Sequence, residues 1–141
     1  MSSVYVIGAD MIGFGRFPQR SVEDLAAEAA LLALDDCGLS IRDMQALYCG
    51  NLYQSASMVG QRVLREIGMT GIPVVNVANA CATGATALRE AWVAIRAGIC
   101  DLVLAVGVEQ MGKGLLGAGT GDGFVAEGAI GSDTMPAMFA L

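Results

Sequence analysis

Short apolar runs alternate with amphipathic stretches along roughly the first hundred residues of the chain. Apolar runs bounded by glycine or polar residues predict four strands, at Val4–Gly8, Ala46–Gly50, Ile72–Val77 and Asp101–Val108. Between them, helical spacing of apolar residues predicts helices from Ser21 to Cys37, from Ser57 to Ile67 and from Thr83 to Ala97. Strands that are apolar throughout and alternate with helices indicate a parallel sheet covered by helices on both faces.

The first helix carries clear signals at both of its ends. Ser21 and Asp24 have the spacing of a capping box, in which each side chain accepts a backbone hydrogen bond at the helix start. Gly38 follows the last residue with helical spacing and predicts the helix end. Ser40 and Asp43 repeat the capping signal, which indicates a second, shorter helical turn.

The last thirty residues follow a different pattern. Gly112–Gly131 contains eight glycines and few periodic apolar positions, which predicts a long loop or a set of tight turns. A phosphate-binding loop is the weaker alternative, because no Gly-Lys-Ser/Thr sequence occurs there. We expect a mobile connection near a substrate channel instead. Ser132–Leu141 begins an apolar segment that stops without a helix cap.

Composition narrows the class of protein. Hydrophobic residues make up 55% of the 141 residues and charged residues 16%, which is enough for one domain with a core and argues against disorder. Lys and Arg total only 8 and are scattered, and the net charge is -6, so we expect no nucleic-acid partner. The longest apolar stretch is far shorter than the ~20 residues of a bilayer helix, so we expect no membrane span. The start lacks the features of a signal peptide.

Four cysteines occur, at positions 37, 49, 81 and 100. They form no CxxC pair, and the chain has no histidine, which argues against a zinc site. Without a secretion signal, we expect free thiols in a reducing, cytoplasmic compartment. Cys37, Cys49 and Cys100 are interpreted as structural residues at a helix end, in a strand and in a turn.

Cys81 is the candidate catalytic residue. In the segment Val75–Leu88, a strand leads into a short polar turn, and the cysteine stands where the next helix begins. Free N–H groups at the amino end of a helix favour the thiolate, which is the nucleophilic form of cysteine and can accept an acyl group. Small residues then let the helix run close to neighbouring backbone. Taken by itself, the pattern also fits a small apolar core cysteine, since no general base is identified beside it.

The order of these motifs resembles the thiolase superfamily, and in particular thiolases of the sterol-carrier-protein and acetyl-CoA acetyltransferase type. Asn76–Leu88 is similar to the nucleophile motif of that family, Asn-x-x-x-x-Cys-Ala-Thr-Gly-x-Thr-Ala-Leu. Gly60–Gly68 resembles the helix before it, and Asp101–Met111 the strand and turn after it. Asp133–Leu141 resembles the entry to the family's next helix, so the likeness covers essentially the whole chain.

This resemblance implies a layered α/β/α sandwich in which two similar halves pack together, with residues 1–141 supplying an incomplete first half. It implies acyltransferase chemistry on CoA thioesters: thiolytic cleavage of a 3-oxoacyl-CoA, or the reverse Claisen condensation. Cys81 corresponds to the acylated nucleophile, and Asn76 and Asn79 correspond to the turn before it. No permanently bound cofactor is expected, because acyl-CoA is the substrate. A homo-oligomer, dimer or tetramer, is implied, since the strand before this turn lies at a dimer interface in relatives.

The chain also departs from the family. Relatives use two histidines and a second cysteine from the second half as base, oxyanion donor and acid, and this chain has no histidine. It also lacks the loop domain that follows in relatives. We therefore expect the isolated chain to be a poor or inactive thiolase. It is either a fragment of a longer enzyme, which the apolar end at Leu141 favours, or a short subunit completed by a partner chain.

Two other functions remain open. A thiolase-like aldolase acting on sterol side-chain CoA thioesters shares the fold and relies on residues other than Cys81. A non-catalytic acyl-CoA-binding scaffold subunit, paired with a small OB-fold protein, is the alternative from another class. Glu109 could be interpreted as a general base, but a carboxylate directly after a buried strand is more often held by hydrogen bonds, so we predict a structural role for it.

Overall fold

The computed structural model describes residues 3–111, and the chain divides into two units after Gln110, of which the first is described here. This unit contains three helices, three strands and two 3-10 turns in its described residues. In chain order they are α1 (Val22–Asp36), η1 (Ile41–Asp43), β1 (Leu47–Gly50), η2 (Ser55–Ser57), α2 (Val59–Ile67), β2 (Val74–Val77), α3 (Thr83–Arg96) and β3 (Leu104–Gly107). The predicted loop at Gly112–Gly131, the alternative phosphate loop and the segment Ser132–Leu141 lie outside the described residues.

The three strands form one parallel sheet in the order β2-β1-β3. Gly50, the last residue of β1, lies opposite Val77 of β2 and Gly107 of β3. The carboxyl ends of all three strands therefore meet at the same edge of the sheet, where the next loop of each strand begins. The predicted parallel sheet is confirmed.

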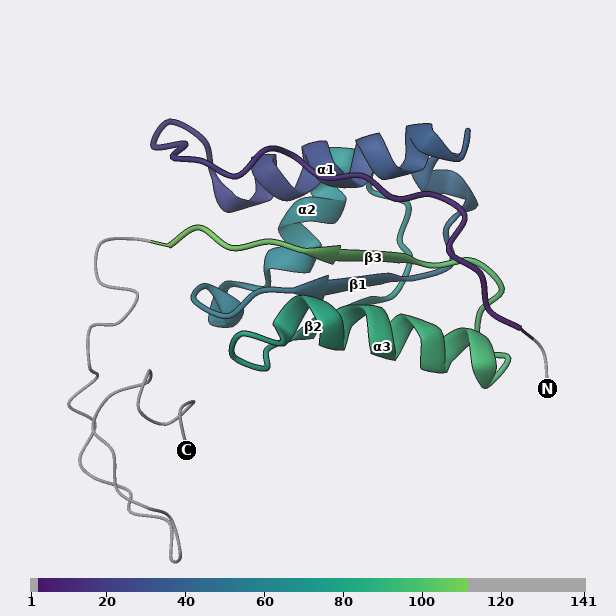
Figure 1. Ribbon diagram of the computed structural model, residues 1–141. Helices are drawn as coiled ribbons and strands as arrows, with labels where there is room; N and C mark the ends of the chain where they lie inside the picture. The colour runs from purple at the N-terminus through teal and green to yellow at the C-terminus, as the bar shows by residue number, and fades with distance from the viewer. Residues whose placement is uncertain (1–2, 112–141) are drawn as a thin grey trace, which may run out of the picture. The chain divides into compact units, whose positions relative to one another are not determined.

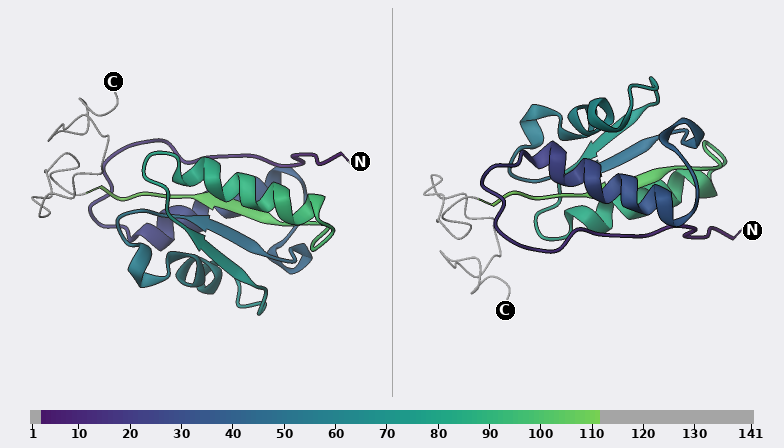
Figure 2. Two further views of the ribbon diagram at one scale, coloured as in Figure 1. Left: turned by 90° about the horizontal axis from the view of Figure 1, so that it is seen from below. Right: turned by 90° about the horizontal axis from the view of Figure 1, so that it is seen from above.

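The unit has three layers. Helices α1 and α2 lie on one face of the sheet and α3 lies on the other (Figure 1). Seen from below, α3 crosses in front of the strands, and seen from above α1 does so (Figure 2). This arrangement confirms the α/β class and the layered α/β/α order for this part of the chain.

The two faces of β1 contribute to two separate clusters of buried side chains. Leu47 and Cys49 are fully buried against α1 and α2, where Val59 and Val63 are also buried. The residues of β1 that alternate with these, among them Tyr48, belong to the cluster under α3. The α3 cluster consists mainly of alanines: Ala46, Ala87, Ala91 and Ala94. This alternation is the period of a strand covered on both faces.

Helix α1 begins and ends as its sequence predicts. The Ser21 hydroxyl accepts a hydrogen bond from the Asp24 N–H at 3.2 Å, and the Asp24 carboxylate accepts one from the Ser21 N–H at 3.0 Å. These bonds lower the pKa of the Asp24 carboxyl, chiefly through the Ser21 backbone N–H. Cys37 is the C-cap, and Gly38 follows it in the left-handed region at φ 68°. The second capping box, at Ser40 and Asp43, is also present and opens η1.

Helix α2 begins two residues later than predicted. Ser55–Ser57 forms η2, and Met58 then takes a left-handed conformation with φ 50° before α2 starts at Val59. A left-handed methionine interrupts the helical path, which the apolar spacing alone does not reveal. Gly68 ends the helix as predicted. No helix within residues 3–111 is long and apolar enough to cross a membrane.

The predicted strand at Val4–Gly8 is wrong. The segment has no strand pairing, and Tyr5 and Val6 are 76% and 73% exposed. A cavity of about 800 Å³ lies between this segment, the outer side of β3 and α3, so the segment does not reach the β3 edge. An apolar run needs a neighbouring strand edge to hydrogen-bond with, and sequence periodicity does not show whether one is within reach. Directly after the segment, the Ala9 N–H donates to the Asp36 carboxylate of α1 at 3.0 Å.

Candidate active site

Cys81 lies at the carboxyl edge of the sheet, between β2 and α3. Cys81 is exposed to solvent and directly precedes Ala82, the N-cap of α3. Ala82 has no side chain that can cap the helix, and no side-chain cap bond is made there. The first N–H groups of a helix lack partners within the helix, so this end of α3 favours negative charge beside it. The structure thus places the predicted nucleophile at an accessible helix start without a side-chain cap, where the Thr83 N–H donates to the Ala80 carbonyl at 3.2 Å.

The turn before Cys81 contains an unusual backbone conformation. Ala80 has φ 45°, in the left-handed region, which costs a residue other than glycine about 1–2 kcal/mol. The Thr83 hydroxyl lies inside this turn, where it accepts from the Asn79 N–H and donates to the Ala80 carbonyl, both at 2.7 Å. Thr83 itself is 7% exposed. These bonds fix the two residues that precede the cysteine.

Glycines bring the start of α3 against the sheet. A Cβ added to Gly107 of β3 would lie 3.1 Å from the Gly84 Cα, and one added to Gly50 of β1 would lie 2.9 Å from the Thr83 carbonyl oxygen. Backbone therefore contacts backbone at this point, which explains the small residues after Cys81. Ala87 further along the helix is fully buried, whereas Leu88 is 54% exposed.

The two asparagines predicted for the turn have different locations. Asn79 lies in the turn, and its side chain donates to the Thr86 hydroxyl at 3.0 Å. Asn76 lies inside β2, so its assignment to the turn is corrected. Its side-chain oxygen accepts from the Gly60 N–H at 2.7 Å, at the amino end of α2, and its amide donates to Gln61 at 2.7 Å. An asparagine in an edge strand can satisfy a neighbouring helix end, and no local pattern distinguishes this from a role in the turn.

Glu109, which follows β3, is held by hydrogen bonds as predicted. Its carboxylate accepts from the Asn51 side-chain amide at 3.1 Å and from the backbone N–H groups of Leu52 and Tyr53 at 2.9 and 3.2 Å. It also accepts from the N–H of Gln110 at 3.2 Å. Glu109 thereby joins the loop after β1 to the end of β3, and the structural interpretation is confirmed.

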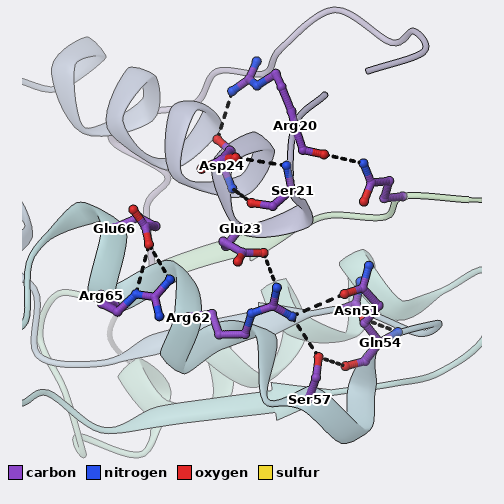
Figure 3. A network of polar contacts seen from close by, with 11 residues as sticks. Arg20, Ser21, Glu23, Asp24, Asn51, Gln54, Ser57, Arg62, Arg65 and Glu66 are labelled. Carbon is purple, nitrogen blue, oxygen red and sulfur yellow. Dashed lines mark hydrogen bonds and ion pairs between the residues drawn. The ribbon is translucent and has the colours of Figure 1, made fainter. Parts of the chain in front are cut away.

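A second polar network at this edge has no signature in the sequence. Arg62 of α2 forms an ion pair with Glu23 of α1, and it also donates to the Ser57 hydroxyl at 3.0 Å and to Gln54 at 3.3 Å (Figure 3). The Glu23 side chain is 10% exposed. Burial acts to raise the pKa of Glu23, but hydrogen bonds and the Arg62 charge outweigh it, so the pKa lies below its ordinary value. The network connects both helices of one face to the loop beside the candidate site.

The other three cysteines occupy structural positions, as predicted. Cys49 is fully buried in β1, and burial raises the pKa of its thiol to about 12. Cys100 is buried in the turn after α3. The half-buried Cys37 thiol donates to the carbonyls of Ala33 and Leu34 at the end of α1. Only Cys81 among the four combines exposure with a helix amino end.

Cys81 does not line either of two hollows found in the described residues. One is the cavity beside the N-terminal segment, and the other, of about 910 Å³, is an open hollow beside α1 and η1. Within residues 3–111, no three side chains of the metal-binding types converge on one point. Neither of these two hollows therefore supplies a substrate pocket for the Cys81 thiol.

Comparison with known proteins gives one consistent result. Residues 4–130 match the family model of the thiolase N-terminal domain. The chain is 38% identical over 121 residues to sterol carrier protein 2 of Gallus gallus, covering 84% of this chain and 22% of that protein. It is 36% identical over 115 residues to an acetyl-CoA acetyltransferase of Methanothermobacter thermautotrophicus, covering 79% of this chain and 30% of that protein.

A solved structure has the same fold. The 3-oxoacyl-[acyl-carrier-protein] synthase III from Aquifex aeolicus VF5 aligns with a TM-score of 0.58 over 64% of this chain and 30% of the other, at 20% sequence identity. The chain spans between about a fifth and a third of the length of these proteins.

Proposed function

Because the chain belongs to the thiolase family, we propose that it provides the nucleophilic half of an acyl-CoA acyltransferase, with Cys81 as the residue that carries the acyl group. The observation that supports this proposal is the exposed thiol at the amino end of α3, which has no side-chain cap. The name of one relative, acetyl-CoA acetyltransferase, agrees with a substrate of the acyl-CoA class.

The proposed step is a transthioesterification. The Cys81 thiolate attacks the carbonyl carbon of an acyl-CoA and forms a tetrahedral intermediate with a new carbon–sulfur bond. The bond from that carbon to the CoA sulfur then breaks, and CoA leaves as a thiolate that takes up the proton released by Cys81. The acyl group remains on Cys81 as a thioester.

The second half of the reaction needs a general base, which is a histidine in the family that the sequence resembles. Passing the acyl group to CoA or to an acyl-CoA carbanion requires a base, and the 141 residues contain no histidine. We propose that thiolytic cleavage of a 3-oxoacyl-CoA, or the reverse condensation, is the activity of the complete assembly. The isolated chain is proposed to perform the acylation step alone, and slowly.

We also propose that two copies pair through β2. This strand is at the edge of the described sheet, and Val75 is 39% exposed on it. An edge strand presents unpaired backbone groups that a second strand can satisfy. Sedimentation equilibrium of the chain measures this directly, and a monomer at all concentrations contradicts the pairing.

The acylation step is tested by intact mass spectrometry after incubation with acetyl-CoA. We expect a mass increase of one acetyl group, mapped to the peptide that contains Cys81, and its complete loss in Cys81→Ala. Cys100→Ala is the matched control, and it retains the adduct because Cys100 is buried. An absent adduct in the folded wild-type chain contradicts the proposal and favours the acyl-CoA-binding scaffold. If a complete assembly keeps its activity with Cys81→Ala, the aldolase alternative is favoured.

A further inference from the structure

We propose that Thr83 is the positioning residue that holds Cys81 at the amino end of α3. This inference rests on the proposed function of Cys81 and adds a residue that controls it. Thr83 is the first residue of α3 and lies two residues after the cysteine. Three features of the structure support the assignment: the hydrogen bonds of its hydroxyl, the conformation of Ala80, and the contact of its methyl group.

The hydroxyl of Thr83 joins the two residues on the amino side of Cys81. It accepts from the Asn79 N–H and donates to the Ala80 carbonyl, with both distances at 2.7 Å. The hydroxyl has one proton and two lone pairs, so it can make both bonds at once. The Thr83 side chain is therefore the group around which the turn from β2 into α3 is folded.

The backbone conformation of Ala80 needs stabilisation by a hydrogen bond of this kind. Its φ of 45° lies in a region that alanine rarely occupies. The Ala80 carbonyl also accepts from the Thr83 backbone N–H at 3.2 Å, so it has two donors from the same residue. Without the hydroxyl, one of them is lost, and Ala80 is free to return to a more favourable conformation. Cys81 is the next residue, so any rotation at Ala80 moves its sulfur away from the helix end.

The methyl group of Thr83 makes a separate, apolar contact with the sheet. A Cβ added to Gly50 would lie 3.0 Å from the Thr83 Cγ2, so the methyl group packs directly on the end of β1. One side chain thus combines a polar contact with the turn and an apolar contact with the sheet. The two contacts can be removed one at a time, since valine keeps the shape without the hydroxyl and serine keeps the hydroxyl without the methyl.

The experiment measures the rate of Cys81 acylation by acetyl-CoA and the rate of its alkylation by iodoacetamide, each by peptide mass, in the full chain. Thr83→Val is expected to slow both reactions by about 10- to 100-fold, as small displacements of a reacting group do. Thr83→Ser is expected to react within about threefold of the wild type. Thr70→Val, an exposed threonine outside the site, is the matched control and is expected to leave both rates unchanged.

A double-mutant cycle separates positioning from general destabilisation. Glycine occupies the left-handed region without penalty, so Ala80→Gly is expected to restore part of the rate that Thr83→Val loses. Urea unfolding of each variant provides the stability. We expect Thr83→Ser to lose stability and keep its rate, and Thr83→Val to lose rate, whereas a purely structural role makes rate follow stability. If Thr83→Val does not unfold cooperatively, Thr83→Ala removes the same hydroxyl.

Wild-type rates in Thr83→Val, or a Thr83→Ser as slow as the valine variant, overturn the inference. Failure of the proposed function has a different signature, because the wild-type chain then shows no acylation while its alkylation still responds to Thr83. The two proposals can thus fail independently.

Discussion

On one face of the sheet, α1 and α2 bury large aliphatic side chains, and on the other α3 buries a row of alanines and leaves its larger residues in solvent. Val22, Leu47, Val59 and Val63 are at most 1% exposed on the first face, whereas Leu88 and Trp92 of α3 are 54% and 49% exposed. The first face has the packing of a finished core. The second face has the candidate nucleophile Cys81 just before the start of α3, a helix whose larger side chains are half-exposed. Matched pairs of residues, one from each face, test how far this difference extends.

Two cysteines, one on each face, give the largest expected difference, which is in their rates of alkylation. Cys49 is fully buried on the α1 and α2 face with a thiol pKa of about 12, and Cys81 is exposed at the start of α3. At pH 8 a thiol with that pKa is ionised in roughly one molecule in 10⁴. Iodoacetamide labelling followed by peptide mass mapping is expected to modify Cys81 at least about 10³ times faster than Cys49.

The control is labelling in urea, where the two rates converge as the core opens. Equal rates in the folded protein contradict the contrast, because they require that the α1 and α2 face opens readily.

Two leucines give the next contrast, in stability. Leu47→Ala removes a fully buried side chain from the central strand, and the free energy of unfolding is expected to fall by about 2–5 kcal/mol. Leu88→Ala truncates a half-exposed side chain of α3 and is expected to change it by less than about 0.5 kcal/mol.

Urea titration monitored by circular dichroism measures both values. A Leu88→Ala variant as unstable as Leu47→Ala shows that the α3 face is buried in solution, for example against a second copy.

Two ion pairs give the smallest expected difference between the faces, a difference in stability that depends on pH. Glu23→Gln breaks the pair with Arg62 and is expected to lower the free energy of unfolding by about 1–2 kcal/mol at pH 7. The folded-state pKa of Glu23 lies below its ordinary value of 4.5, so its contribution is fully present above pH 4.5. It is lost as the pH falls through the folded-state value, where the variant and wild-type stabilities converge.

Glu90→Gln is the matched control on α3. Glu90 pairs with Arg89, whose side chain is 70% exposed. Loss of this pair is therefore expected to lower the free energy of unfolding by less than about 0.5 kcal/mol. Unfolding titrations from pH 3 to 7 compare the two variants. A Glu23→Gln deficit that persists unchanged at pH 3 contradicts the assigned role of the carboxylate.

Much of this architecture is encoded locally and is therefore predictable from the sequence. The capping boxes at Ser21 and Ser40 and the helix-ending glycine Gly38 act within a few residues, and each occurs where its pattern predicts. The apolar strands also predict the parallel sheet, since burial on both faces requires helices on both sides. The position of Cys81 at the start of α3 follows from the same kind of local pattern.

The features that could not be predicted depend on contacts between distant residues. The Arg62–Glu23 pair joins residues 39 positions apart, and nothing near either residue indicates the other. Asn76 bonds α2 instead of the turn because of how two elements pack, not because of its neighbours in sequence. The N-terminal apolar run has strand-like composition, but its pairing depends on an edge that it does not reach.

The contact between Gly84 and Gly107 has a consequence for how this family of sites can vary. Where two main chains touch directly, the position of the first turn of α3 on the sheet is set by backbone contact, with no side chain between them. Side chains elsewhere around the turn can then be exchanged while this backbone contact keeps the helix start in place. The placement of the helix start is thus independent of the side chains that surround it.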